Sequence, residues 1–88
     1  MNIDFSKSFD NQFQNRLSAR QRQQALEAIE LFIDKPYHKD LRNHPLYGKW
    51  KGYRSISVSG DLRLHFKIVA DDRVLFEAVG SHGQLYKR

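Results

Sequence analysis

Histidines are the residues of this 88-residue chain whose type bears most directly on chemistry, and the chain has no cysteine. Zinc sites on helices need histidines one turn apart, as in an H-E-x-x-H motif, and structural zinc sites usually include thiolates. The four histidines offer no such spacing; they are His38, His44, His65 and His82. We therefore expect neither a metal ion nor a cofactor.

Gly48 and Gly52 also fail to form a phosphate-binding loop, because no helix and no Lys-Ser or Lys-Thr ending follows them. The remaining reaction class that the residue types fit is metal-independent cleavage of RNA. This reaction needs a base for the 2′-hydroxyl proton, an acid for the leaving 5′-oxygen and a cation for the phosphate. Histidine and arginine can supply all three roles.

Three segments with strand composition must position these side chains. In residues 61–68, apolar side chains alternate with polar ones, which is the period of a half-buried strand. Gly60 predicts a hairpin turn before this strand, since glycine tolerates positive φ. A second polar turn at 70–73 follows. We expect an antiparallel meander of strands at 53–58, 62–69 and 74–79.

Two amphipathic helices are predicted ahead of this sheet, at about 8–17 and 19–34. Ser18 and Gln21 fit a capping box at the start of the second helix, and Pro36 limits its end. The fold class is therefore α+β, with a helix hairpin packed on one face of a small twisted antiparallel sheet. The predicted core is Leu26, Ile29, Ile33, Leu64, Phe66, Val74 or Leu75, and Phe76.

Three other segments give weaker patterns. Residues 1–5 are compatible with a short edge strand, and residues 84–88 with a final strand or a loose tail. Residues 37–49 have no clear period and are predicted to form a long loop, which is a kind of segment that often carries function.

Length and charge bound the class of protein. A chain this short buries only somewhat more than roughly 60% of its unfolded surface, so residues 1–88 form one domain. The net charge is +5, and the basic excess lies within residues 36–88. This asymmetry fits a polyanion such as nucleic acid, or simply a solvated basic face. Without an apolar run of membrane-spanning length or a signal-peptide pattern, we expect a cytoplasmic protein with no membrane partner.

The second half of the chain also contains a distinctive set of motifs. It reads His-Pro-Leu-x-Gly-x-Trp-Lys-Gly-Tyr-Arg from position 44, then Asp61 at the start of a strand, then Gly-Ser-His-x-x-Leu-Tyr from position 80. Over residues 37–86 this resembles the YafQ branch of the RelE/ParE superfamily of bacterial toxins. The resemblance implies a RelE-like fold and a small ribonuclease that cleaves mRNA on the translating ribosome. It also implies a cognate antitoxin that holds the toxin inactive in a hetero-oligomer.

The resemblance assigns catalytic roles to four residues, which are His44, Asp61, Arg63 and His82. The two histidines match catalytic histidines of the family pattern, and the aspartate matches its functional aspartate. Arg63 stands where RelE and YoeB relatives place a phosphate-binding arginine.

Two family positions differ in this chain. Ser57 stands where YafQ-like sequences have a further catalytic histidine, and Ala78 where the family has an arginine. Arg63 is a candidate to compensate for that missing arginine. These departures keep open a weakened activity.

Further candidate substrate contacts are Lys49, Lys51, Arg54, His65 and Tyr86. Each assignment has a simpler alternative. Asp61 and Arg63 share a strand face and could merely pair with each other, and His65 could be a solvated strand residue.

Three functions therefore remain from the sequence. The first is a ribosome-dependent endoribonuclease toxin. The second is a ParE-like toxin that binds DNA gyrase, against which the retained His44, Asp61 and His82 argue, since such binding needs no acid and base. The third is a catalytically weakened relative that acts only by binding.

Overall fold

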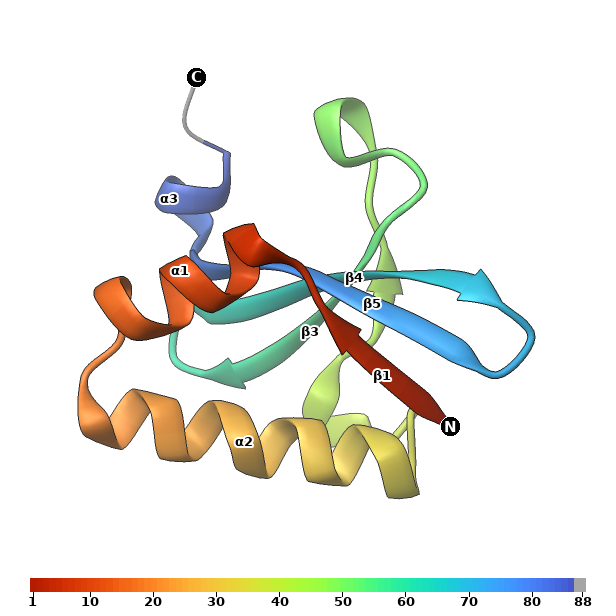
Figure 1. Cartoon of the computed structure of the whole chain (residues 1–88), viewed down its shortest axis with the longest axis horizontal. Helices are drawn as coiled ribbons and strands as arrows, with labels where there is room; N and C mark the ends of the chain where they lie inside the picture. The colour runs from red at the N-terminus through yellow and green to blue at the C-terminus, as the bar shows by residue number, and fades with distance from the viewer. Residues whose placement is uncertain (87–88) are drawn as a thin grey trace.

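The computed structural model describes residues 1–86, which form a five-stranded sheet with helices packed on it (Figure 1). The sheet order is β1-β5-β4-β3-β2. The strands are β1 (Asn2–Phe5), β2 (His44–Pro45), β3 (Arg54–Ser59), β4 (Leu62–Ala70) and β5 (Arg73–Ser81). The helices are α1 (Lys7–Arg16), α2 (Ala19–Asp34) and α3 (His82–Leu85), with short 3-10 helices η1 (Lys39–Leu41) and η2 (Gly48–Trp50).

The predicted meander is confirmed, because β3 pairs antiparallel with β4, and β4 with β5. Gly60 occupies the first turn with a φ of 51°. The edge strand at residues 1–5 is confirmed as β1, and it pairs parallel with β5, so the whole sheet is mixed rather than antiparallel throughout. Parallel neighbours need a long crossover connection, and the stretch from α1 to β4 provides one between β1 and β5.

Both long helices begin at serine caps. Ser6 Oγ accepts a hydrogen bond from the Phe9 amide at the start of α1. The capping box predicted for α2 is confirmed: Ser18 Oγ accepts from the Gln21 amide, and Gln21 Oε1 accepts from the Ser18 amide. These bonds satisfy backbone amides that have no partner within the helix.

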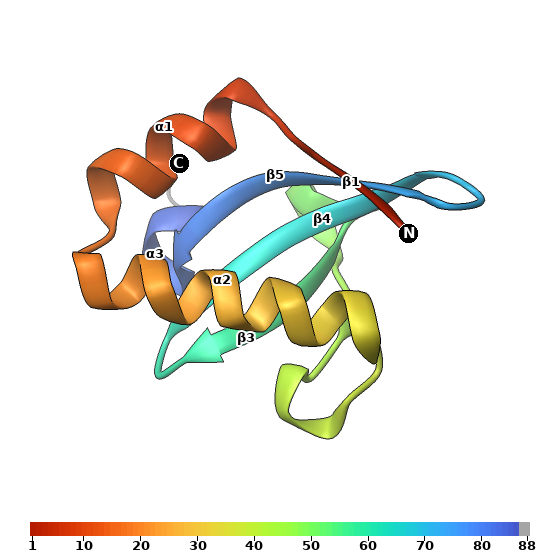
Figure 2. The same cartoon turned by 60° about the horizontal axis from the view of Figure 1, so that its bottom comes forward.

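The core lies between these helices and one face of the sheet, as Figure 2 shows for α2 crossing over β3, β4 and β5. Phe76 of β5 is fully buried at its centre. The ring centroid of Phe76 lies 6.0 Å from that of Phe9 in α1 and 5.6 Å from that of Phe32 in α2. The rings of Phe66 and Phe76 are also in contact, at 5.4 Å. The predicted core positions in β4 and β5 are thus confirmed, with Val74 rather than Leu75 buried.

Two of the predicted core residues of α2 are exposed. Leu26 and Ile33 retain 46% and 45% of their accessible surface, whereas Ile29 retains 6%. The buried stripe of α2 is narrower than expected and consists of Ala25, Ala28, Ile29 and Phe32. Leu26 and Ile33 flank this stripe, so hydrophobicity alone misassigned them.

Side chains at the start of and within α1 complete one edge of β5. Strand β1 pairs only with Arg73–Phe76, which leaves the later part of β5 without a neighbouring strand on that side. The amide and carbonyl of Val79 bond there to Gln12 Oε1, at 2.9 Å, and Arg16 Nη1, at 3.1 Å. Ser6 Oγ donates to the carbonyl of Glu77 at 3.0 Å. These bonds fix the part of β5 that leads into α3.

Two segments are more ordered than the sequence suggested. The predicted loop at 37–49 contains η1, β2 and the start of η2. The predicted final strand or tail at 84–88 begins instead with the end of α3, and residues 87–88 lie outside the described part of the chain. Within residues 1–86, none of the helices has the length and apolar character required to span a bilayer.

The narrow stripe of α2 predicts unequal costs for two isoleucines one turn apart. We expect Ile29→Ala to lower the free energy of unfolding by about 2–5 kcal/mol, because it opens a cavity against the sheet. The matched control Ile33→Ala should cost about 1 kcal/mol or less, since this side chain is half exposed. Urea unfolding followed by circular dichroism measures both; equal costs would refute this packing.

Candidate active site

The face of the sheet opposite the helices carries the polar side chains of three strands. Side chains alternate along a strand. Ile56, Leu64 and Val79 point into the core, so the residues directly before and after each of them point away from the helices. The strand register aligns these residues in two rows. They are Ser57, Arg63 and Gly80 in one row, and Ser55, His65 and Ala78 in the next.

Arg63 and Asp61 take different partners rather than pairing with each other. Arg63 Nη1 donates to Ser57 Oγ at 2.8 Å, across the β3–β4 pair. Asp61 Oδ2 accepts from the backbone amide of His82 at 3.3 Å. Arg63 is therefore held against Ser57, and Asp61 ties the β3–β4 turn to the first residue of α3.

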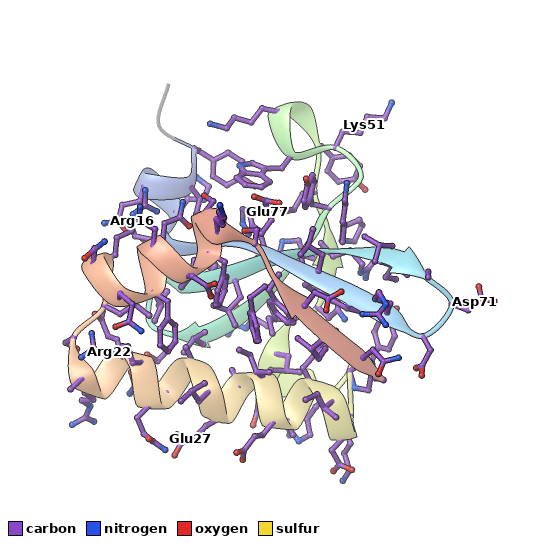
Figure 3. All side chains as sticks on the ribbon, viewed as in Figure 1. Arg16, Arg22, Glu27, Lys51, Asp71 and Glu77 are labelled. Carbon is purple, nitrogen blue, oxygen red and sulfur yellow. The ribbon has the colours of Figure 1, made fainter. Side chains whose placement is uncertain are left out.

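His82 is positioned by the start of α3. Ser81 caps this helix with a capping box: its Oγ accepts from the Gln84 amide, and Gln84 Oε1 accepts from the Ser81 amide. A Cβ on Gly80 would lie 2.8 Å from Arg16 Nη1 and 2.9 Å from Gln84 Oε1, so the ends of these two side chains would have to shift to admit one. Figure 3 shows Arg16 reaching from α1 toward this region.

His44 is held in β2, at the edge of the sheet. It pairs with Ser55 of β3, and its ring Nδ1 lies 2.7 Å from the carbonyl oxygen of Arg42. A carbonyl only accepts, so in the neutral ring Nδ1 carries the hydrogen and Nε2 has a free lone pair. Arg42 adopts a left-handed conformation with a φ of 51°, which turns its carbonyl to this role.

Trp50 joins the loop that contains η2 to α3. Its indole Nε1 donates to the carbonyl oxygen of Leu85 at 3.0 Å. Its ring centroid lies 4.6 Å from that of His65 in a T-shaped contact and 5.1 Å from that of Tyr53. Figure 1 shows this loop and α3 on the side of the sheet away from α2.

Tyr86 contacts both His65 and His82. Its ring centroid is 4.6 Å from that of His82 and 5.8 Å from that of His65. The aromatic position predicted near the C-terminus therefore packs directly against the histidine of α3.

His65 is fully buried, so both interpretations of this residue, a substrate contact and a solvated strand residue, are wrong. Trp50 and Tyr86 contact a position that alternation alone leaves exposed. Burial, and after it the charges of His44, Arg63 and His82, lower the pKa of His65 from 6.5 to about 4. The geometry groups the same three residues around this ring: His44 pairs with Ser55, which pairs with His65. Arg63 precedes His65 by two residues on the same face, and Tyr86 contacts both His65 and His82.

The basic candidates are divided between the two sides of the molecule. Lys49 and Lys51 are exposed in and beside η2, and Lys51 projects outward from this loop (Figure 3). Arg54 is not brought to the site. Its Nε donates to Asn43 Oδ1 at 2.8 Å, and its guanidinium carbon lies 5.7 Å from the centre of the Tyr37 ring.

Sequence analysis missed two features of this site. The capping box of α3 has the same Ser-x-x-Gln pattern as that of α2, and that signal could have predicted a helix at 82. No local pattern in the sequence indicates the bond from Trp50 to Leu85.

The fold is that of small bacterial toxins. A YoeB/ParE toxin from Agrobacterium tumefaciens superposes with a TM-score of 0.76 over 93% of this chain and 99% of that chain; at 19% identity this likeness shows the fold alone. A chain of the Escherichia coli DinJ–YafQ complex superposes with a TM-score of 0.75 at 28% identity, over 97% of each chain. The class is thus a RelE/YoeB-type toxin fold.

The particular family follows from the sequence comparison. The family model described as the bacterial YafQ toxin of type II toxin-antitoxin systems matches residues 1–87. The mRNA interferase toxin YafQ of Escherichia coli strain K12 is 42% identical over 45 residues, which are 51% of this chain. The chain spans about half the length of this curated relative, 48%. The chain belongs to the YafQ toxin family.

The buried ring predicts a pH-dependent stability. Unfolded, His65 binds a proton near its ordinary pKa of 6.5, whereas the folded chain lowers this pKa to about 4. The free energy of unfolding that depends on a neutral His65 is fully present above pH 6.5 and is lost as the pH falls from 6.5 to 4, because the unfolded chain then binds the proton more tightly. The loss of unfolding free energy over this pH range is roughly 3 kcal/mol.

Urea unfolding of the wild type and of His65→Phe, at about pH 7 and about pH 4.5, measures this contribution. We expect the wild type to lose more stability than the variant over this interval, because phenylalanine cannot bind a proton. Other titrating groups are common to both proteins and cancel in the difference. Equal losses would show that His65 titrates normally in the folded chain.

Proposed function

We propose that this chain is an endoribonuclease toxin that cleaves mRNA on the ribosome by metal-independent acid–base chemistry. The single observation that carries the proposal is the grouping of His44, Arg63 and His82 around the buried His65 ring by strand register and ring contacts. The name of the Escherichia coli relative, an mRNA interferase toxin, supports the same substrate class. The reaction requires a base, an acid and a cation at one phosphate, and these three side chains supply them.

His44 is proposed as the general base. Its Nδ1 hydrogen is committed to the Arg42 carbonyl, which leaves Nε2 to take the proton of a substrate 2′-hydroxyl. The 2′-oxygen then forms a bond to phosphorus. Because His44 is exposed at the sheet edge, its ring is accessible to a nucleic acid.

His82 is proposed as the general acid. As the bond between phosphorus and the 5′-oxygen breaks, a His82 imidazolium gives its proton to that oxygen. The products are a 2′,3′-cyclic phosphate and a 5′-hydroxyl, so protons and bonds balance without water or metal. Tyr86 packs against the His82 ring, and Asp61 holds its backbone amide, so both position the acid.

Arg63 is proposed to stabilise the negative charge that builds on the phosphate in the transition state. Its hydrogen bond to Ser57 supports this role, since it holds a cation where YafQ-like sequences have a histidine. Ala78 is buried beside His65 and offers no cation. Arg63 thus supplies from β4 the positive charge that Ala78 lacks.

The partners follow from the same family. The Escherichia coli relative is found in a DinJ–YafQ complex, which supports a cognate antitoxin as the inhibitor of this chain in a hetero-oligomer. Ribosome-bound mRNA as the substrate implies a cytoplasmic location. Lys49 and Lys51 are proposed to contact the nucleic-acid backbone beside the site, since both are exposed on the loop that Trp50 anchors.

The proposed chemistry predicts large losses of activity on removal of either histidine. We expect His44→Ala and His82→Ala each to lower the single-turnover cleavage rate of a programmed ribosomal complex by roughly 10²–10⁴-fold. Arg63→Ala should weaken substrate binding as well as the cleavage step. His38→Ala is the matched control, because His38 caps η1 and lies outside the site.

Circular dichroism should show each variant to be folded. Cleavage that survives His82→Ala undiminished would remove this histidine from the mechanism. Absence of wild-type cleavage, with and without ribosomes, would contradict the proposed activity and favour a gyrase-binding or purely binding relative.

The proposed backbone contacts predict salt-dependent binding. We expect Lys51→Ala to weaken binding to ribosome-bound mRNA and to lower the slope of log K against log salt by about one, since each phosphate contact releases counterions. Lys35→Ala is the control, because Lys35 lies at the end of α2, on the side of the sheet away from the η2 loop. A filter-binding titration at several salt concentrations measures both slopes. Equal slopes for Lys51→Ala and wild type would rule out this contact.

A further inference from the structure

His65 has no place among the groups that exchange protons with substrate. None of its surface is accessible, and neither ring nitrogen has a hydrogen-bond partner among residues 1–86. A buried imidazole usually gains such partners, because leaving its nitrogens unpaired costs free energy. Another residue type would avoid this cost, so the ring needs a physical explanation.

The packing around the ring provides one. Trp50 meets His65 at 4.6 Å with an interplanar angle of 83°, and Tyr86 meets it at 5.8 Å with an angle of 69°. Both are edge-to-face arrangements, which aromatic rings favour. The imidazole is therefore a platform on which one ring from the loop and one ring from the C-terminal end of α3 both rest.

We propose that His65 is a positioning residue: its ring sets the separation between the η2 loop and α3, and thereby the placement of His82 relative to Arg63 and His44. This inference rests on the proposed function for its kinetic consequence. Trp50 links the His65 ring to α3 through its hydrogen bond to the Leu85 carbonyl. Tyr86 links the His65 ring to the His82 ring by contacting both. The ring acts by its shape, not by contact with RNA.

The same geometry separates this role from two others. A substrate contact would need a ring nitrogen, whereas a platform needs only a flat ring of similar size. A general packing role would be shared by Leu64, the residue directly before His65 on β4, which is equally buried but faces the helices. Substitutions at the two positions therefore distinguish the three roles.

The test uses two variants of His65 and one of Leu64. His65→Phe keeps a ring, His65→Ala removes it, and Leu64→Val opens a small cavity on the other face of the same strand. Trp50 is the only tryptophan of the chain, so its fluorescence reports on the platform directly. Single-turnover cleavage, measured with the same ribosomal complex over a range of concentrations, separates the maximal rate from the apparent affinity.

We expect His65→Ala to shift Trp50 emission to longer wavelength and to lower the maximal cleavage rate by about 10- to 100-fold, with the apparent affinity nearly unchanged. His65→Phe and Leu64→Val should retain the emission maximum and most of the rate. If His65→Ala proves unfolded, His65→Leu, which fills the space without a flat ring, takes its place in the comparison with His65→Phe.

Two results would overturn the proposal. A folded His65→Phe that loses the maximal rate while keeping normal Trp50 emission would show that the ring nitrogens, not the ring, are needed. A folded His65→Ala with wild-type emission and rate would show that no platform exists. If emission responds as expected but no protein cleaves RNA, the positioning of Trp50 stands and the proposed function fails.

Discussion

The hydrogen bond from Trp50 to the Leu85 carbonyl connects two segments that lie 35 residues apart and together flank the site. One segment follows the short edge strand that carries His44, and the other is the helix that begins with His82. No strand pairing joins them, since α3 lies beyond the end of β5 and η2 beyond the end of β2. The sheet carries His44 in β2 and ends β5 at Ser81, next to His82, and the ring contacts over His65 join the η2 loop to α3.

The sheet supports this arrangement by keeping its two faces distinct. One face is apolar and closed by α1 and α2 around Phe76, which accounts for most of the burial in a small chain. The other face places Arg63 and His65 on the central strand β4, where neighbours on both sides restrict the backbone. The bonds from α1 to Val79 fix the edge of β5, so α3 starts from a rigid position.

The sequence predicts the elements better than it predicts their contacts. Alternation along β4 and the serine cap of α2 are local signals, and both segments fold as expected. The parallel pairing of β1, the exposure of Ile33 and the burial of His65 each depend on packing between distant segments, which local periodicity does not encode. Arg54 illustrates the same limit within a motif: its neighbours in sequence reach the site, while its own side chain bonds to Asn43 on the other side.

The proposed mechanism requires His44 and His82 to act on one phosphate in one transition state. The most direct measurement is the cleavage rate of the double variant His44→Ala/His82→Ala compared with both single variants. Residues that act as a unit have strongly non-additive effects, so the double variant should be hardly slower than the slower single variant. If the fold-decrease in the rate of the double variant equals the product of the two single fold-decreases, a single shared site is contradicted.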